Sequence, residues 1–262
     1  MRRIHAFELE DQPSMPEVLR EAGMAYLRFA AEKFGVAEKI RPLIESALER
    51  SGEEEILDLC SGGAGPVLAI AAALAASGRG IPVTLSDRYP DPGAIELADA
   101  SGIPGLRYES KPMDALEVPA ERAGLRTLFN GFHHLRPAQA QAVLASAVRG
   151  QRPIAILEVL QRKPLVIIGM LFSPLMALLI VPFLRPFRLA WIPLTYLVPA
   201  IPLFIMWDGI VSCLRIYNKE ELLGMARAVD PDDTFDWQVH SIPLDPQPVP
   251  GIALIGIPRK AQ

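Results

Sequence analysis

Short apolar runs alternate with helix-like stretches from residue 55 to the C-terminal part of the chain. Short apolar runs bounded by Gly, Pro, Asp or Ser are typical of buried strands, whereas apolar residues every three or four positions are typical of helices. The pattern predicts strands at 55–59, 81–87, 106–110, 126–130, 153–159, 235–244 and 251–259. It predicts helices at 66–76, 93–100, 138–149 and 219–229. Strands separated by helices imply right-handed crossovers and a parallel sheet covered on both faces.

The two ends of the chain complete this α/β, doubly wound and mostly parallel pattern. The last two strands are close together in sequence, so we expect an antiparallel pair at the sheet edge. Residues 14–50 have a helical pattern, with Ser14 as a candidate cap and Pro16 and Glu17 in the first turn. We expect the chain to form three parts: an N-terminal helical cap at 1–50, a core at 51–160 and 218–262, and an apolar helical insert at 161–217.

The insert interrupts the alternation with two uncharged stretches, 165–184 and 189–207. Every charge between Glu158 and Asp208 is positive. Length alone would permit membrane spans, but a spanning hairpin would carry two arginines across the bilayer, and closely spaced prolines would leave backbone groups unpaired in hydrocarbon. We therefore expect an insert seated on the membrane surface. A soluble lid over an apolar pocket and true spans are the alternatives. The aromatic residues suited to the headgroup level are Trp191, Tyr196 and Trp207.

Composition excludes some functions. The formal net charge is −4 and the pI is about 5.7, which argues against a general nucleic-acid binder because no basic surplus is present to neutralise phosphates. Cys60 and Cys213 lie far apart without ligand or disulfide spacing, which favours a reducing cytoplasm. The first residues carry two arginines with no apolar segment behind them, so we expect no signal peptide.

Residues 56–66, ILDLCSGGAGP, form a glycine-rich turn after a predicted strand and before a predicted helix. Doubly wound folds bind nucleotide-like cofactors at such turns. The dinucleotide fingerprint G-x-G-x-x-G fails, because its third glycine would fall on Leu68. No Lys-Ser or Lys-Thr follows, so the P-loop pattern fails as well. A phosphate-binding loop is therefore not expected.

The stretch D-L-C-S-G-G-A-G, starting at Asp58, resembles the first motif of class I S-adenosylmethionine-dependent methyltransferases. Further pieces follow in the order of that family: an acid ending the second strand, PMDALEVP, LFNGFHHLRP and the strand AILEV. FELEDQPSMPEVLR and WDGIVSCLRIYNKEEL resemble a bacterial subgroup with an apolar segment after strand five. The resemblance implies S-adenosylmethionine as cofactor. The residues it implies for binding are Asp58, Cys60, Ser61, Gly62, Gly63, Asp87, Met113, Asp114 and Asn130.

The turn departs from the family pattern at two positions. Cys60 and Ala64 stand where the family has its first and third glycines, so we expect a tighter or differently routed turn. Three acids also have purely structural alternatives. Asp58 would brace the loop or cap a helix, Asp87 would form a turn, and Asp114 would cap a short helical turn.

Methyl transfer requires a positioned acceptor and, for many acceptors, a base. His133 and His134 are the candidate bases, with Glu158 less favoured. Because adjacent residues point in different directions, we expect at most one histidine to face the cofactor. The alternative is that both bond the backbone at the start of the following helix. We expect no metal site, because His5 and His240 are remote in sequence and no carboxylate has ligand spacing to the pair.

The acceptor pocket is expected between the insert and the N-terminal segment. The candidate substrate-binding residues are Asp11, Arg20, Asp208, Arg215 and Tyr217; alternatively, Asp208 and Arg215 form a salt-bridged hinge. The exposed hydrophobicity of the insert favours methylation of a hydrophobic or lipid-like small molecule at the inner membrane surface. The alternative is a membrane-associated binding or assembly protein that keeps the cofactor-binding fold without methyl transfer. A homodimer that buries the insert is a further alternative.

Overall fold

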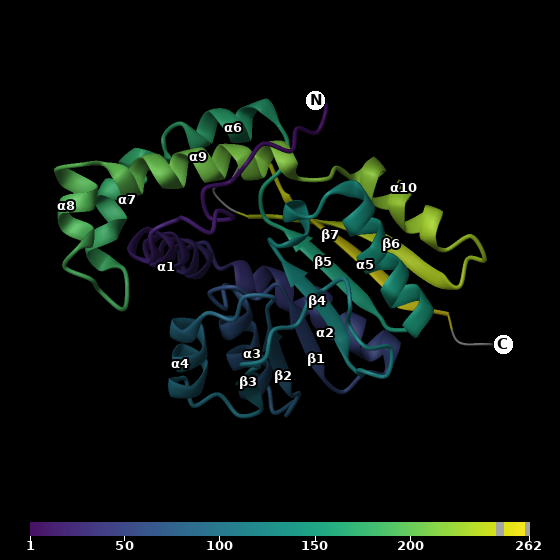
Figure 1. The fold of residues 1–262 in the computed structure, drawn as a ribbon. Helices are drawn as coiled ribbons and strands as arrows, with labels where there is room; N and C mark the ends of the chain where they lie inside the picture. The colour runs from purple at the N-terminus through teal and green to yellow at the C-terminus, as the bar shows by residue number, and fades with distance from the viewer. Residues whose placement is uncertain (245–248, 260–262) are drawn as a thin grey trace.

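A seven-stranded sheet forms the centre of the computed structural model, which describes residues 1–244 and 249–259 (Figure 1). The strand order is β3-β2-β1-β4-β5-β7-β6. The strands are β1 (Ile56–Leu59), β2 (Val83–Ser86), β3 (Leu106–Tyr108), β4 (Leu125–Phe129), β5 (Ile154–Glu158), β6 (Phe235–Ile242) and β7 (Gly251–Pro258). The first five strands pair in parallel, whereas β7 pairs antiparallel with both β5 and β6. The predicted doubly wound sheet with an antiparallel edge is confirmed.

Helices cover both faces of the sheet because the central strands are buried on both sides. One apolar cluster joins the sheet to three helices, and the other joins it to two. The first group is α2 (Val36–Ser51), α3 (Val67–Ala76) and α4 (Pro92–Ala100); the second is α5 (Pro137–Gly150) and α10 (Lys219–Val229). Neighbouring residues of β1 illustrate the alternation, with Ile56 in the first cluster and Leu57 in the second. Chain order reverses between β1 and β4, so the crevice at their carboxyl ends is where ligands bind in such sheets.

The N-terminal helical region differs from the prediction in two respects. It is two helices, α1 (Glu17–Lys33) and α2, because Gly35 between them adopts a left-handed conformation with φ of +58°. Ser14 is not the cap. Pro16 precedes the first helical residue, and no side chain caps α1.

The insert is a layer of short helices that extends from one end of the sheet (Figure 1). Its elements are α6 (Pro164–Met170), α7 (Ser173–Ile180), η2 (Val181–Phe183), α8 (Trp191–Tyr196) and α9 (Ala200–Arg215). A third apolar cluster joins this layer to α1, where Gly23 allows close approach of Phe204. Trp191 does not lie at a surface as predicted, since it is buried in this cluster and its indole N–H donates to Val18 O at 3.0 Å.

The boundaries proposed for the three parts stay a prediction. Within residues 1–50, α1 packs on the insert while α2 packs on the sheet. Residues 245–248 and 260–262 of the proposed core lie outside the described part of the chain.

Among the described residues, no single helix has both the length and the apolar character needed to cross a membrane. Two bent helix pairs, Pro164–Met170 with Ser173–Phe183 and Ala200–Arg215 with Lys219–Val229, meet that test together by length and composition.

Candidate active site

The glycine-rich turn after β1 keeps a glycine-like backbone although it contains two side chains. Cys60 and Ala64 have φ of +57° and +66°, and Gly62 between them has +45°. A residue with a side chain costs about 1–2 kcal/mol in this left-handed region, so the surrounding contacts must stabilise the route. Whether the turn is tighter or differently routed than in the family stays a prediction. Gly131 explains part of the fit, since a Cβ there would lie 2.9 Å from Cys60 Cβ.

Asp58 braces this turn from inside the protein. Its carboxylate is 1 % exposed and accepts hydrogen bonds from Ser61 Oγ and Thr127 Oγ1, both at 2.6 Å. Ser61 Oγ also accepts a hydrogen bond from Ser86 N at 3.0 Å, which ties the turn to β2. Burial raises the pKa of Asp58 to about 7, although the two hydroxyl donors favour the ionised form. The side chains of Asp58 and Ser61 therefore support the turn, as the structural alternative for Asp58 had it, and a direct contact of either residue with the cofactor stays a prediction.

Asp87 links the end of β2 to the glycine turn. One carboxylate oxygen accepts a hydrogen bond from Gly62 N at 2.9 Å, and the other accepts one from Tyr89 N at 2.8 Å. Tyr108 closes the turn from the next strand, because its hydroxyl donates to Gly62 O at 2.9 Å. A Cβ built on Gly62 would meet nothing within 4 Å, so there is open space above the turn beside Asp87.

The other predicted cofactor residues lie at the ends of neighbouring strands. Met113 N donates to Asp87 O at 2.8 Å. Asp114 accepts from Leu116 N at 2.9 Å, the capping contact given as its alternative, and its second oxygen lies 3.5 Å from Arg88 Nε.

Gly63 and Asn130 flank the turn on two sides. Gly63 packs under α1, where Arg28 Nη1 donates to Gly63 O at 3.1 Å. Asn130 follows β4 with φ of +50°, and its amide oxygen accepts from Val159 N at 2.9 Å. Cys60 is half-buried, and burial raises the pKa of its thiol far above the usual range. A thiol held protonated is not a nucleophile.

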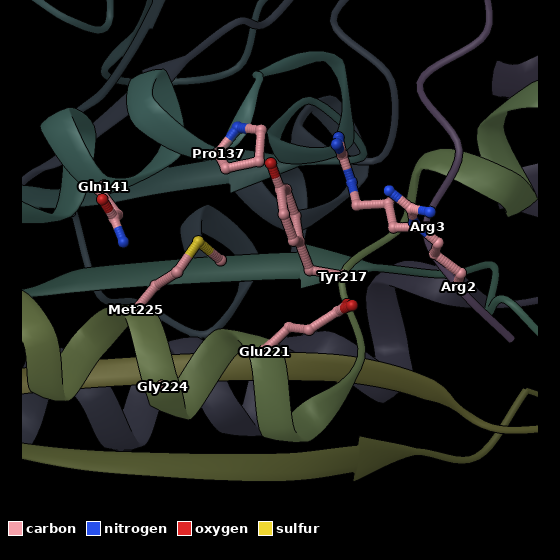
Figure 2. Close-up of a pocket in the computed structure, with 8 residues that line it drawn as sticks. All are labelled: Arg2, Arg3, Pro137, Gln141, Tyr217, Glu221, Gly224 and Met225. Atoms are coloured by element: carbon pink, nitrogen blue, oxygen red, sulfur yellow. The ribbon is translucent and has the colours of Figure 1, made fainter.

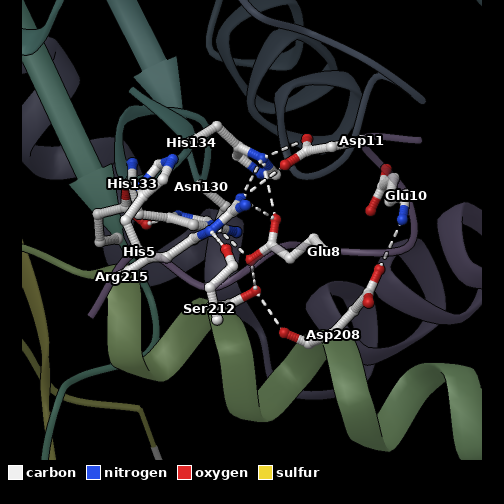
Figure 3. Close-up of polar contacts among 12 residues, drawn as sticks. His5, Glu8, Glu10, Asp11, Asn130, His133, His134, Asp208, Ser212 and Arg215 are labelled. Atoms are coloured by element: carbon white, nitrogen blue, oxygen red, sulfur yellow. Dashed lines mark hydrogen bonds and ion pairs between the residues drawn. The ribbon is translucent and has the colours of Figure 1, made fainter. Parts of the chain in front are cut away.

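The two histidines lie on the short helix η1 (Phe132–His134) directly after β4. Glu158 at the end of β5 holds His133 twice, accepting from its backbone N at 2.9 Å and lying 2.8 Å from its Nδ1. The rings of His133 and His134 lie against each other with centroids 4.3 Å apart, so the expected divergence of the pair is wrong (Figure 3). Both bond carboxylates and not the backbone of the following helix.

An extended N-terminal segment, residues 3–11, lies along α9, and we call it the strap. Ile4 N donates to Leu214 O at 3.0 Å, and Arg215 Nε donates to Ala6 O at 2.7 Å. Asp208 accepts from the backbone N–H groups of Leu9 and Glu10 at 2.8 and 2.9 Å. These contacts bury Glu8, only 1 % exposed, beside His133.

Arg215 and His134 pair with two carboxylates of the strap, those of Glu8 and Asp11 (Figure 3). Arg215 Nη1 lies 2.8 Å from Glu8 Oε2 and 2.7 Å from Asp11 Oδ2. His134 Nδ1 lies 3.0 Å from Glu8 and 2.9 Å from Asp11. Burial alone would lower the pKa of His134, but the hydrogen bonds with Asp11 and Glu8 outweigh it and raise this pKa well above its usual value. We call Glu8, Asp11, His133, His134 and Arg215 the histidine cluster.

Three predicted substrate residues take other roles. Asp208 and Arg215 each bind the strap, and the proposed hinge pair between them is not formed. Arg20 Nη2 donates to Gln12 O at 3.0 Å, so it supports the chain between the strap and α1.

Tyr217 lies on the other side of η1, where its hydroxyl donates to Leu135 O at 2.8 Å. The Arg3 guanidinium lies over its ring, 4.0 Å from the centroid. Both residues line an open pocket of about 480 Å³ between α5 and α10 (Figure 2). Tyr217 therefore lines this pocket, and its part in substrate binding stays a prediction.

The sequence argument against a metal site missed Glu8. Ligand atoms of Glu8, His133 and His134 lie within 4.8 Å of one another, and His133 Nε2 is buried without a hydrogen-bond partner, 3.7 Å from Glu8 Oε1. Arg215 Nη1, however, already contacts Glu8 and lies 3.5 Å from His134 Nδ1. A metal ion held by these ligands would face a guanidinium cation at close range. We therefore interpret the cluster as an ion-pair network.

The sequence did not predict Glu8 as a site residue, and it did not predict that Glu158 would hold the ring of His133 in place. The only available signals were an acidic run just before the first helix and an acid that ends a predicted strand. Neither indicates which histidine it would contact, because the contact depends on how the strap crosses α9.

Comparisons with known proteins agree with this architecture. No family model and no curated protein matches the chain. The methyltransferase domain of the bacterial protein CtHen1 superposes with a TM-score of 0.50 at 10% identity, over 84% of this chain and 98% of that one. A putative O-methyltransferase from Nostoc punctiforme gives 0.52 at 14% identity over 97% and 64%, and the S-adenosylmethionine-dependent methyltransferase SibL gives 0.51 at 15% identity over 99% and 63%. The chain spans just under two thirds of the last two proteins. It has the class I methyltransferase fold.

Proposed function

We propose that this protein transfers a methyl group from S-adenosylmethionine to a hydrophobic or lipid-like small molecule at the inner membrane surface. The glycine turn carries the cofactor part of the proposal, and the exposed apolar side chains of the insert support the choice of acceptor and membrane surface. Cys60 and Ala64 hold conformations that glycine would adopt more readily, and such strained positions cluster at ligand sites. The turn lies at the point where the strand order reverses, with open space above Gly62.

The residues around this space fit the cofactor. Each carboxylate oxygen of Asp87 has a second lone pair beyond its backbone hydrogen bond, so the two oxygens can accept the ribose hydroxyls. Met113 would lie beside the adenine ring and Asp114 near its amine, while Gly62 allows close approach of the backbone. When bound, S-adenosylmethionine supplies an electrophilic methyl group on a sulfonium.

His133 is the residue that we assign to proton removal from the acceptor. Glu158 accepts a hydrogen bond from Nδ1, which fixes the tautomer in which Nε2 carries a free lone pair. Nε2 can therefore take the proton of an acceptor hydroxyl or amine, and the resulting imidazolium is stabilised by Glu158. Glu8 now fills the space beside Nε2, so an acceptor that binds there requires the strap to move.

The cofactor assignment is tested at Asp87. We expect Asp87→Asn to weaken S-adenosylmethionine binding at least about tenfold in calorimetry, because one charged acceptor is lost. Asp99→Asn, at an exposed position on α4, is the matched control and should bind as the wild type does. Unchanged affinity in a folded Asp87→Asn variant would remove the cofactor assignment.

Methyl transfer is tested with methyl-labelled S-adenosylmethionine and fractionated cell extract. We expect label in the lipid or apolar small-molecule fraction. His133→Ala should abolish most of the transfer without weakening cofactor binding. Tight cofactor binding with no transfer to any fraction would favour the binding or assembly protein, a function that the buried position of Glu8 beside His133 also fits.

A further inference from the structure

We propose that the outer surface of α6, α7 and the loop at residues 185–190 docks this protein onto a bilayer of anionic lipids. This proposal names the membrane as the partner of the proposed enzyme. The reason for docking rests on the proposed methyl transfer, whereas the surface itself is argued from exposure and charge. Sixteen of the twenty-two exposed large apolar side chains in the described part of the chain belong to residues 164–207. A surface with that many exposed apolar side chains marks an interaction site.

The exposed apolar side chains on α6, α7 and η2 form a stripe along the segment, which bends by 43° between the two helices. Most of them recur every three or four positions, as on one face of a helix, and exposed Leu171 and Met176 widen the stripe. The stripe residues are Leu165, Ile168, Phe172, Leu175, Leu179 and Phe183. A helix with such a face lies in the plane of a membrane interface, with the apolar side roughly 5–10 Å deep.

The loop that follows combines apolar and cationic side chains. Residues 185–190 are all exposed. Phe187 lies between Arg185 and Arg188 in the sequence, and Leu189 follows Arg188. Leu189 is 81 % exposed. Arg188 pairs with Glu21 at 2.7 Å, and Arg185 donates to the adjacent carbonyl of Leu184. Neither contact buries the cation, so both arginines remain accessible to lipid phosphates.

The charge of the segment selects a membrane over a second copy of the chain. No acid occurs between Glu158 and Asp208. The exposed cations of this segment are Lys163, Arg185 and Arg188, whereas Arg162 is buried and paired with Glu221. In a two-fold dimer the same patch meets itself, so these cations would face equivalent cations with no carboxylate from the segment between them. An anionic leaflet instead attracts each exposed cation near the surface.

A further exposed apolar pair, on α9 and the strap, lies next to the histidine cluster in sequence. Exposed Trp207 on α9 stacks with exposed Phe7 of the strap, with centroids 5.2 Å apart, and its indole N–H donates to Phe7 O at 3.1 Å. The next residue, Glu8, is buried beside His133. An apolar acceptor that leaves the bilayer near Phe7 would thus arrive close to the proposed base.

Vesicle sedimentation of the full chain without cofactor tests the proposal. We expect binding to vesicles containing phosphatidylglycerol, weaker binding to pure phosphatidylcholine, and partial loss in high salt. Leu175→Glu with Leu179→Glu should reduce binding at least about tenfold, because two exposed anchors become anionic. The matched control is Leu27→Glu with Phe34→Glu, which adds the same charge at exposed apolar positions outside the insert and should bind like the wild type.

The outcomes distinguish a lipid bilayer from a second copy of the chain as the partner of this surface. Equal vesicle binding by the wild type and the α7 variant overturns the proposal. So does a dimer in analytical ultracentrifugation that the α7 variant, but not the control, dissociates, because the surface then joins two copies. Lipid-independent binding to both vesicle types overturns the anionic preference. Cofactor affinity, measured on the same variants, is expected to be unchanged, so failure of vesicle binding is distinguishable from failure of the methyltransferase assignment.

Discussion

The glycine turn and the histidine cluster lie at the same edge of the sheet but are held together in different ways. The turn is a run of consecutive residues, and it is held by hydrogen bonds from backbone and hydroxyl groups to Asp58 and Asp87, including one from Thr127 on β4. The cluster joins the strap, η1 and α9, and its contacts are ion pairs of the buried Arg215 with buried Glu8 and exposed Asp11. Hydrogen-bonded turns lose their interactions one at a time. A buried ion network loses its charge balance when a single member is removed.

The largest expected effect is loss of the cation at the centre of the cluster. Arg215→Ala leaves Glu8 buried without its guanidinium partner, and we expect the free energy of unfolding to fall by about 3–5 kcal/mol. The control is Arg188→Ala, which removes a partly exposed pair with Glu21 and should cost less than about 1 kcal/mol. Urea denaturation measures both. Equal small costs would show that the cluster is not an interdependent network.

Asp58 gives the turn a pH dependence of its own. Its folded-state pKa of about 7 lies above the ordinary aspartate value, so between about pH 4 and pH 7 the native state holds a proton that the unfolded chain has lost. Stability therefore falls as pH rises through this window. Asp58→Asn removes the titration, and we expect it to gain about 2–4 kcal/mol relative to the wild type from pH 4 to pH 8. Denaturation at several pH values measures the trend.

The matched variant for Asp58 is Asp99→Asn, whose side chain is exposed on α4 and should show a flat difference from the wild type. A flat difference for Asp58→Asn as well would mean that Asp58 is ionised throughout and that the turn tolerates a buried charge.

His134 gives the cluster a dependence at higher pH. Its folded-state pKa is raised by Asp11 and Glu8 despite burial, so its stabilisation is complete below the unfolded value and is lost as pH rises through the folded value. Hydrogen exchange at the strap amides of Ile4, Leu9 and Glu10 should show protection that weakens above about pH 6.5. His134→Gln should lower that protection by about 1 kcal/mol and remove its pH dependence.

His240→Gln, on β6 and remote from the strap, is the control for this exchange experiment. If strap protection in the wild type is constant across the range after correction for intrinsic exchange, the pairing of His134 with the strap does not contribute to its docking.

The smallest expected effect concerns Ala64 in the turn. Ala64→Gly relieves the left-handed conformation but increases the freedom of the unfolded chain, and we expect a change within about 1 kcal/mol of zero. Ala64→Val keeps the strain and adds volume at a fully buried position, so it should destabilise by about 2 kcal/mol or more. Thermal melts compare the two. A large gain from Ala64→Gly would show that the turn stores more strain than its geometry indicates.

The fold and the turn were predictable from sequence because their signals are local. Strands such as 153–159 and helices such as 219–229 follow from periodicity, and the turn follows from consecutive residues around Gly62. The break at Gly35 was missed because the apolar pattern continues on both sides of it, so only the backbone conformation reveals it.

The histidine cluster was predictable only in part, because its contacts join residues that are far apart in the sequence. His133 and Arg215 were singled out by residue type, but Glu8 contacts them across the whole length of the chain. Nothing in residues 7–11 indicates that the segment will run along α9, since Asp208 accepts hydrogen bonds from backbone groups that every sequence has. The direction of the two histidine rings depends on those carboxylates and could not be found before the strap was placed.

The strap has a consequence for the rate of the proposed reaction. Its backbone bonds to α9 and Asp208 must open before any acceptor reaches His133 Nε2, and such local openings proceed on their own timescale. Entry of acceptor and exit of methylated product would then share one gate, and the turnover number would report how often that gate opens, with the methyl transfer itself a faster event behind it.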